Sequence, residues 1–252
     1  MKLIDTHCHL ESTEFDLDRD IVVERARAKQ IDIISSAVTS DSWQKNIDIC
    51  QKYNNVFPAL GLNPIDCQNI DGLLLFLKKY HSNLVAIGEC GLDYYFERNH
   101  AAREKQAMSF LESIRIAEEL KLPIQVHSRS AGKAAITLLE KADARLVHMH
   151  AFDAKASVAR MASRELGYFF SIPTSVVRSP QKQKLVRAVH IEKLLVETDS
   201  PVLGVEGGTR NEPSNLPIAL REVASILNRN EDEICQIILE NTLRLYSRIK
   251  IK

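Results

Sequence analysis

The stretch KLIDTHCH, residues 2–9, decides how the rest of the chain is interpreted. Its apolar start predicts a buried strand, and the strand ends in side chains that bind metals. Residues two apart on a strand point to the same face, so the imidazoles of His7 and His9 are expected to form a chelate. Cys8 then points to the opposite face, and we interpret it as a small buried hydrophobic residue rather than a ligand.

Similar short apolar runs recur along the chain and alternate with longer stretches of helical period. The predicted strands are Lys2–His9, Ile31–Val38, Val56–Leu62, Leu84–Glu89, Pro123–His127, Ala144–His150, Gly167–Ile172 and Lys193–Thr198. The predicted helices are Arg19–Lys29, Asp41–Tyr53, Gly72–His81, Arg103–Leu120, Lys133–Lys141, Lys155–Glu165, Pro180–Val189, Pro217–Leu227 and Glu231–Ser247, the last with Asn230 as its N-cap and Glu233 completing a capping box.

Alternating strands and helices predict a parallel sheet, which either closes into a barrel or stays open. Polar side chains follow several different strands, and only a barrel brings all those strand ends to one rim. The length of 252 residues is typical of a (β/α)8 barrel. We therefore expect one TIM-barrel domain over residues 1–252, with the loop Gly204–Leu216 as a candidate lid.

The composition limits the partners and the compartment that we expect for this protein. Lys plus Arg equals Asp plus Glu, at 33 each, so any contact with phosphate must come from local basic residues or from bound metal. The five cysteines are scattered without a C-x-x-C pair, which favours reduced thiols. Asp5 and His7 interrupt any signal sequence, and no apolar run is long enough for a bilayer. We expect a cytoplasmic protein with no membrane contact, and nothing indicates an obligate protein partner.

Four more predicted strands end in a metal-binding side chain: Glu89, His127, His150 and Asp199. Each residue alone has a structural interpretation, as a satisfied histidine or a helix cap. Together they converge on one rim, where burial without metal would leave unpaired polar groups at about 1–3 kcal/mol each. Catalytic zinc usually takes three protein ligands, so six candidates predict two divalent ions, Mg, Mn, Zn or Co. Glu89 is the expected bridge between the two ions, because its strand lies between the ends of the barrel row. No lysine stands at these strand ends, so a modified lysine is not expected in that role.

Several motifs in order resemble the TatD family of metal-dependent hydrolases over nearly the whole chain. DTHCHL (residues 5–10) resembles the opening motif, and IGECGLDY (87–94) the strand-four motif. PIQVHSR (123–129), ETDSP (197–201) and RNEP (210–213) resemble three more. The resemblance implies a (β/α)8 barrel and a divalent-metal site at His7, His9, Glu89, His127, His150 and Asp199. It also implies deoxyribonuclease activity, often from the 3′ end of single-stranded DNA.

The chain also departs from the family pattern. Asn63 stands where the family usually has a histidine expected near the substrate phosphate; its amide can donate a hydrogen bond but carries no charge. Ser130 replaces a common aspartate after Ser128 and Arg129, and Ala151 replaces a common cysteine. His148 is a second candidate ligand two residues before His150, which we favour because Phe152 follows it in the family's register.

The hypothesis is a two-metal hydrolysis of phosphodiesters in which Asp199 acts as general base and Glu89 as bridging catalytic carboxylate. Arg129 and Arg210 are candidate phosphate contacts, or else exposed surface arginines. The run Tyr94–Phe96 is a candidate for stacking bases, or for packing under a rim loop. Two alternatives stay open: hydrolysis of an amide, ester or lactone on the same barrel, and a non-catalytic barrel that keeps metal for structure.

Overall fold

The computed structural model describes residues 1–250 and contains one eight-stranded sheet in which each strand pairs in parallel with the next. The first and last strands also meet, because the Asp199 N–H donates to His7 O at 2.9 Å and the His9 N–H to Ser200 O at 2.8 Å. The predicted (β/α)8 barrel is confirmed. The strands are β1 (Leu3–Cys8), β2 (Ile31–Ala37), β3 (Val56–Leu60), β4 (Ala86–Gly91), β5 (Ile124–His127), β6 (Val147–Met149), β7 (Phe169–Pro173) and β8 (Leu194–Glu197).

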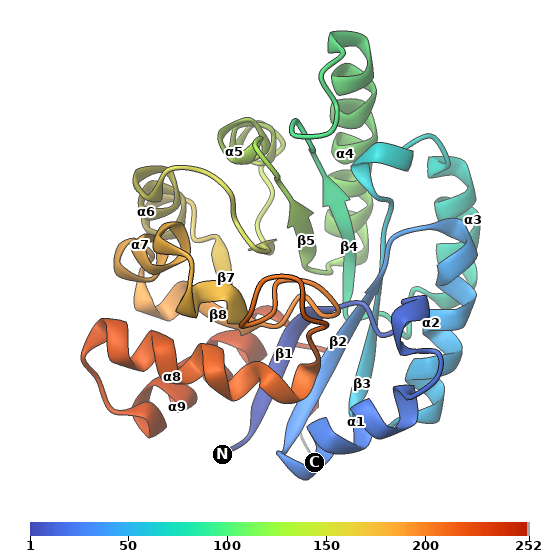
Figure 1. Ribbon diagram of the computed structural model, residues 1–252. Coiled ribbons are helices and arrows are strands. Elements are labelled where there is room, and N and C mark those ends of the chain that lie inside the picture. The colour runs from blue at the N-terminus through green and yellow to red at the C-terminus, as the bar shows by residue number, and fades with distance from the viewer. Residues whose placement is uncertain (251–252) are drawn as a thin grey trace.

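Figure 1 shows the helices wrapped around the outside of these strands. None of the helices within residues 1–250 combines the length and the apolar character needed to span a membrane. They are α1 (Arg19–Ala28), α2 (Ser40–Lys52), α3 (Ile70–Tyr80), α4 (His100–Leu120), α5 (Gly132–Lys141), α6 (Ala156–Glu165), α7 (Pro180–Ala188), α8 (Leu216–Leu227) and α9 (Glu231–Leu245), and short 3-10 turns include Pro64–Asp66 and Pro213–Asn215.

The largest differences from the predicted boundaries have local causes. Helix α4 begins at His100 rather than Arg103, because the Asn99 side chain accepts the Ala102 N–H at 3.2 Å and caps the helix earlier. Strand β6 is shorter than predicted, because the Ala144 N–H donates to Leu139 O, which places Ala144 in the turn that follows α5.

The predicted N-cap of the last helix is present, but the predicted capping box is not completed by Glu233. The Asn230 side chain accepts the N–H groups of Asp232 and Glu233 at 2.8 and 3.3 Å. The Glu233 carboxylate pairs instead with Arg229, which lies in the connection just before the N-cap. Because the Glu233 carboxylate forms this exposed ion pair, it does not accept the Asn230 N–H, the bond that would complete the capping box.

The apolar core has two parts, one between helices and sheet and one inside the barrel. The inner part combines inward-facing strand residues such as Ile4 and Ala86 with Leu245, Tyr246 and Ile249 from the C-terminal segment. Figure 1 shows the N-terminus beside the start of β1, and Leu245, Tyr246 and Ile249 belong to the same cluster as Ile4 of that strand. The C-terminal segment therefore closes the N-terminal end of the strands, which leaves the opposite end for polar side chains.

Candidate metal centre and active site

The six predicted ligands meet at the C-terminal end of the barrel. His7 Nε2 and His9 Nε2 lie 3.3 Å apart, and Asp199 Oδ1 lies 3.7 and 3.6 Å from them. All six side chains are buried or nearly so. Their donor atoms form three overlapping groups, each within 4.8 Å: His7, His9 and Glu89; His7, His150 and Asp199; and Glu89, His127 and His150.

Glu89 belongs to two of these groups because each of its oxygens faces a different pair of imidazoles. Oε1 lies 2.5 Å from His127 Nδ1 and 3.2 Å from His150 Nε2. Oε2 lies 3.4 Å from His7 Nε2 and 3.5 Å from His9 Nε2. The carboxylate therefore spans the whole cluster.

An irregularity in β1 brings its histidines into the barrel. Ile4 faces the interior, so a regular strand would turn His7, three residues later, outward. The register of the β1–β2 pairing shifts between Asp5 and Cys8, which lets His7 and His9 both face inward. Cys8 then points to the outer core, where it is fully buried, as predicted.

Strand β4 uses the same device to present Glu89. Ala86 faces the interior, and the β4–β5 register shifts between Ile87 and Cys90. The chain must also approach β5 closely here, since a Cβ on Gly91, at φ 145°, would lie 2.1 Å from the His127 carbonyl oxygen. Only glycine fits this close approach.

The donor set fits a divalent cation. His9 Nδ1 lies 2.7 Å from Ser36 O and His7 Nδ1 lies 3.2 Å from Gln125 Oε1, and both partners are acceptors. Each Nδ1 therefore carries a proton, which leaves the two Nε2 atoms facing each other as metal-binding positions. A cation between them would take the place of a proton there, and the neighbouring carboxylates supply balancing charge.

Electrostatics within the cluster are dominated by the carboxylates. Burial raises the pKa of Glu89, but His150 and His127 outweigh burial and hold it well below its usual range. Burial lowers the pKa of His127, but Glu89 and Asp93 outweigh burial and raise it to about 9. Burial, together with His7 and His150, holds the pKa of His148 well below its usual range, so this ring is neutral.

His148 and His150 occupy different places although they are two residues apart. His150 Nε2 is in the ligand cluster, whereas both nitrogens of His148 contact other side chains deeper in the barrel, Tyr246 and Ser171. Of the two histidines, the geometry offers His150 as the ligand.

Three polar residues near the cluster were given no role by the sequence analysis. Asp93 is 2% exposed and its Oδ2 lies 3.0 Å from His127 Nε2. Glu11 is buried beside His9 Nδ1 at 3.4 Å. Lys182, from α7, lines the cavity and donates to the carbonyl oxygens of residues 151 and 152 at 2.6 and 2.8 Å. Of these three residues, only Asp93 had a signal in the sequence, because it lies within the IGECGLDY motif. The contact of Lys182 depends on tertiary packing.

The three predicted substrate contacts are placed differently. Asn63 and Arg129 line the cavity above the ligand cluster, which has a volume of about 460 Å³. The Asn63 side-chain oxygen accepts the Ile65 N–H at 2.9 Å, so its NH2 group is the part left for a ligand. Arg210 is not among the lining residues, because its guanidinium makes a two-pronged pair with Asp18 at 2.8 and 2.6 Å.

The predicted lid loop, Gly204–Leu216, is held at its centre by hydrogen bonds. Beside Arg210, the Asn211 side chain donates to Thr174 Oγ1, Thr198 O and Val202 O at 2.8 to 3.0 Å. Leu203, next to Val202, lines the cavity. The segment just before the loop, and not the loop itself, therefore forms part of the cavity wall.

The aromatic run after β4 is split between the two predicted roles. Tyr94 packs against the core, whereas the side chains of Tyr95 and Phe96 are 50% and 60% exposed. The Arg129 guanidinium lies 4.0 Å from the Tyr95 ring centroid and 4.8 Å from that of Phe96. We call Tyr95, Phe96 and Arg129 the rim platform, because they form an exposed aromatic and cationic surface beside the cavity.

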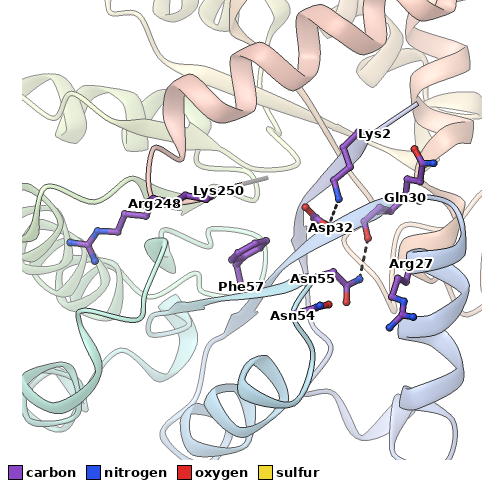
Figure 2. A pocket seen from close by; sticks show the side chains of 10 residues that line it. Lys2, Arg27, Gln30, Asp32, Asn54, Asn55, Phe57, Arg248 and Lys250 are labelled. Carbon is purple, nitrogen blue, oxygen red and sulfur yellow. Dashed lines mark hydrogen bonds and ion pairs between the residues drawn. The ribbon is translucent and has the colours of Figure 1, made fainter. Parts of the chain in front are cut away.

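A second hollow of similar volume, about 490 Å³, lies at the opposite end of the barrel. Figure 2 shows Lys2 reaching Asp32, a 2.7 Å ion pair, while the Arg248 guanidinium points away from the other side chains. Arg248 donates there to the carbonyl oxygens of residues 81, 84 and 120. The side chains around this hollow mainly hold the end of the barrel together. The active site is therefore identified by its metal-binding side chains and not by the volume of its cavity.

The family model described as TatD related DNase matches residues 4–247. The chain belongs to this family. Among TatD-family relatives, it is 37% identical to the human protein named deoxyribonuclease TATDN3, over 98% of this chain and 96% of that one. It is 31% identical to the uncharacterized metal-dependent hydrolase YabD of Bacillus subtilis, over 97% and 98%. A crystal structure of YjjV, a TatD homolog from Escherichia coli K12, superimposes with a TM-score of 0.89 at 25% identity, covering 98% of both chains. The protein is a metal-dependent hydrolase of the TatD type, which argues against a non-catalytic barrel that keeps metal for structure.

The charge balance of the cluster predicts how the metal-free protein responds to pH. The raised pKa of His127 contributes stability that is complete below the ordinary histidine value of about 6.5 and is lost as the pH rises through about 9. We expect the Tm of EDTA-treated protein to fall across this window. His127→Gln should flatten the decline, and a wild-type Tm that stays constant would contradict the charge assignment.

Proposed function

We propose that this protein is a deoxyribonuclease that removes nucleotides from the 3′ end of single-stranded DNA with two divalent ions. One observation carries the proposal: the ligand cluster lies in an open cavity beside the exposed rim platform. Base–aromatic stacking next to a phosphate-cleaving centre suits a single strand, whose bases are free to stack. The names of the relatives, deoxyribonuclease among them, support the same substrate.

Glu89 supports the two-ion part of the proposal, since its two oxygens face separate pairs of histidines. His127 and His150 would hold one ion, and His7 and His9 the other, with Glu89 shared and Asp199 beside the second pair. Divalent ions at such a site activate water and neutralise charge on the phosphoryl group.

Asp199 is the proposed general base. Its carboxylate is 10% exposed and lines the cavity, so it meets both the cluster and the space for substrate. It would take a proton from the attacking water while the bond between phosphorus and the leaving alkoxide oxygen breaks, and solvent would protonate that oxygen.

Arg129 is the proposed phosphate contact, because its guanidinium stacks on the rings of Tyr95 and Phe96 and pairs with no carboxylate within residues 1–250. Asn63 would add a neutral hydrogen bond from its NH2 group. Arg210 would reach a phosphate only after leaving Asp18, so its role stays a proposal that requires movement of the loop.

Digestion of 5′-labelled single-stranded DNA tests the activity directly. With Mg, Mn or Zn added, we expect a ladder that shortens from the 3′ end, and with EDTA we expect none. If DNA stays intact with every metal while the protein still binds two ions, the DNA substrate is wrong. Hydrolysis of a small ester, amide or lactone would then be the function to test on the same centre.

Asp199→Asn tests the general base. Removing the basic carboxylate should lower kcat by roughly 100-fold or more, while metal titrations still show binding. Asp143→Asn is the matched control, because Asp143 is exposed and, within residues 1–250, forms an ion pair only with Arg145. Near-normal turnover in Asp199→Asn would remove Asp199 from this role.

The rim platform predicts a substrate-dependent loss. Stacking is worth about 1–3 kcal/mol per base, so Tyr95→Ala or Phe96→Ala should raise KM for single-stranded DNA roughly 5- to 150-fold. KM for methyl p-nitrophenyl phosphate should change little, since it is too small to span cluster and platform. Leu75→Ala, another exposed apolar position, is the control. Equal losses on both substrates would mean that the platform shapes the centre and does not bind bases.

A further inference from the structure

A chain of buried polar side chains crosses the barrel interior beneath the ligand cluster. It begins at His7 and ends at His150, which come from β1 and from the end of β6. All of its members are at most 5% exposed. The side chains between the two histidines are, in order, Gln125, Tyr246, His148, Ser171 and Glu197.

The direction of the hydrogen bonds is fixed at the His7 end by a backbone carbonyl. Gln125 Nε2 lies 2.9 Å from Thr6 O, which only accepts, so this atom is the amide nitrogen. Gln125 Oε1 then accepts from Ser36 Oγ at 2.5 Å and from His7 Nδ1 at 3.2 Å. His7 therefore carries its proton on Nδ1.

The second N–H of Gln125 fixes the next two bonds. It donates to the Tyr246 hydroxyl at 3.0 Å, so the single hydroxyl proton of Tyr246 is left for His148 Nδ1 at 2.5 Å. A neutral His148 that accepts on Nδ1 carries its proton on Nε2. That proton points to Ser171 Oγ at 2.6 Å.

At the His150 end, the direction of the hydrogen bonds is fixed by the Glu197 carboxylate, which can only accept hydrogen bonds. Ser171 donates to Glu197 Oε2 at 2.6 Å, and the Ala151 N–H donates to Glu197 Oε1 at 2.8 Å. Glu197 Oε2 also lies 3.5 Å from His150 Nδ1. This distance is long for a hydrogen bond, but the negative oxygen favours the proton of His150 on Nδ1.

We infer that Tyr246 and His148 are positioning residues which, through Gln125 and Glu197, hold His7 and His150 as Nδ1–H tautomers with Nε2 free for metal. The bond directions agree from both ends, and reversing the bond between Tyr246 and His148 would leave the hydroxyl proton of Tyr246 without an acceptor. Because Tyr246 follows α9, the inference also links the docking of the C-terminal segment to the metal centre.

The tautomers can be read directly in the zinc-loaded protein, by long-range correlation of the histidine 15N and ring 1H signals. We expect His7 and His150 to be protonated on Nδ1 alone, and His148 on Nε2 alone. A proton on Nδ1 of His148 would overturn the inference, and this measurement needs no variant.

Tyr246→Phe removes the hydroxyl that joins Gln125 to His148. Loss of such indirect support typically weakens metal binding by about 10- to 100-fold, and we expect a loss of Zn²⁺ affinity in this range by calorimetric titration. Tyr168→Phe is the matched control, because Tyr168 is also buried and no hydrogen bond of its hydroxyl is seen within residues 1–250. Wild-type Zn²⁺ affinity in folded Tyr246→Phe, even with a lower Tm, would mean a merely structural role.

Ser171→Ala breaks the chain at a smaller side chain and covers the case in which Tyr246→Phe does not fold. It should weaken Zn²⁺ binding and move the His150 ring signals, and unchanged values for both would contradict the inference. None of these readouts involves DNA. A failure of the proposed nuclease activity would therefore leave the tautomer assignment standing, and the reverse is equally distinguishable.

Discussion

The contact of one buried carboxylate with four imidazoles is the constraint on which the site depends. Glu89 stays ionised although burial opposes it, because the histidines around it compensate its charge. That arrangement requires side chains from β1, β4, β5 and β6 at one height in the barrel. A closed parallel barrel satisfies this requirement, since it brings the ends of non-adjacent strands within a few ångströms of each other.

The barrel interior is apolar at its N-terminal end and polar at its C-terminal end, and the C-terminal segment contacts both parts. At the N-terminal end, Leu245 and Ile249 pack with inward apolar residues of the strands. Tyr246 lies in the same cluster, but its hydroxyl contacts His148 and Gln125. One residue thus joins the apolar half, which supplies stability, to the polar half, which orients the ligands. Register shifts in β1 and β4 make this change possible, because each reverses which residues face inward.

Whether the guanidinium of an arginine at the rim can bind a phosphate depends on the side chains that already contact it. Arg129 stacks on Tyr95 and Phe96 beside the cavity, whereas Arg210 is held by Asp18, 192 residues earlier in the chain. Both were equally plausible phosphate contacts in the sequence. Their difference arises because an ion pair that is already formed must be broken before the guanidinium meets a phosphate.

The sequence by itself determined the barrel, the convergence of the six candidate ligands and the family. Strand and helix periods are local, and the six residues stand where strands end, so the barrel rule was sufficient to bring them together. Only the tertiary structure decided that Asp93 and Lys182 contact the site, and that His148 and Tyr246 lie beneath it. These outcomes depend on register shifts and on contacts between distant parts of the chain. A residue's neighbours in sequence carry no information about such contacts, because they form only when the whole barrel closes.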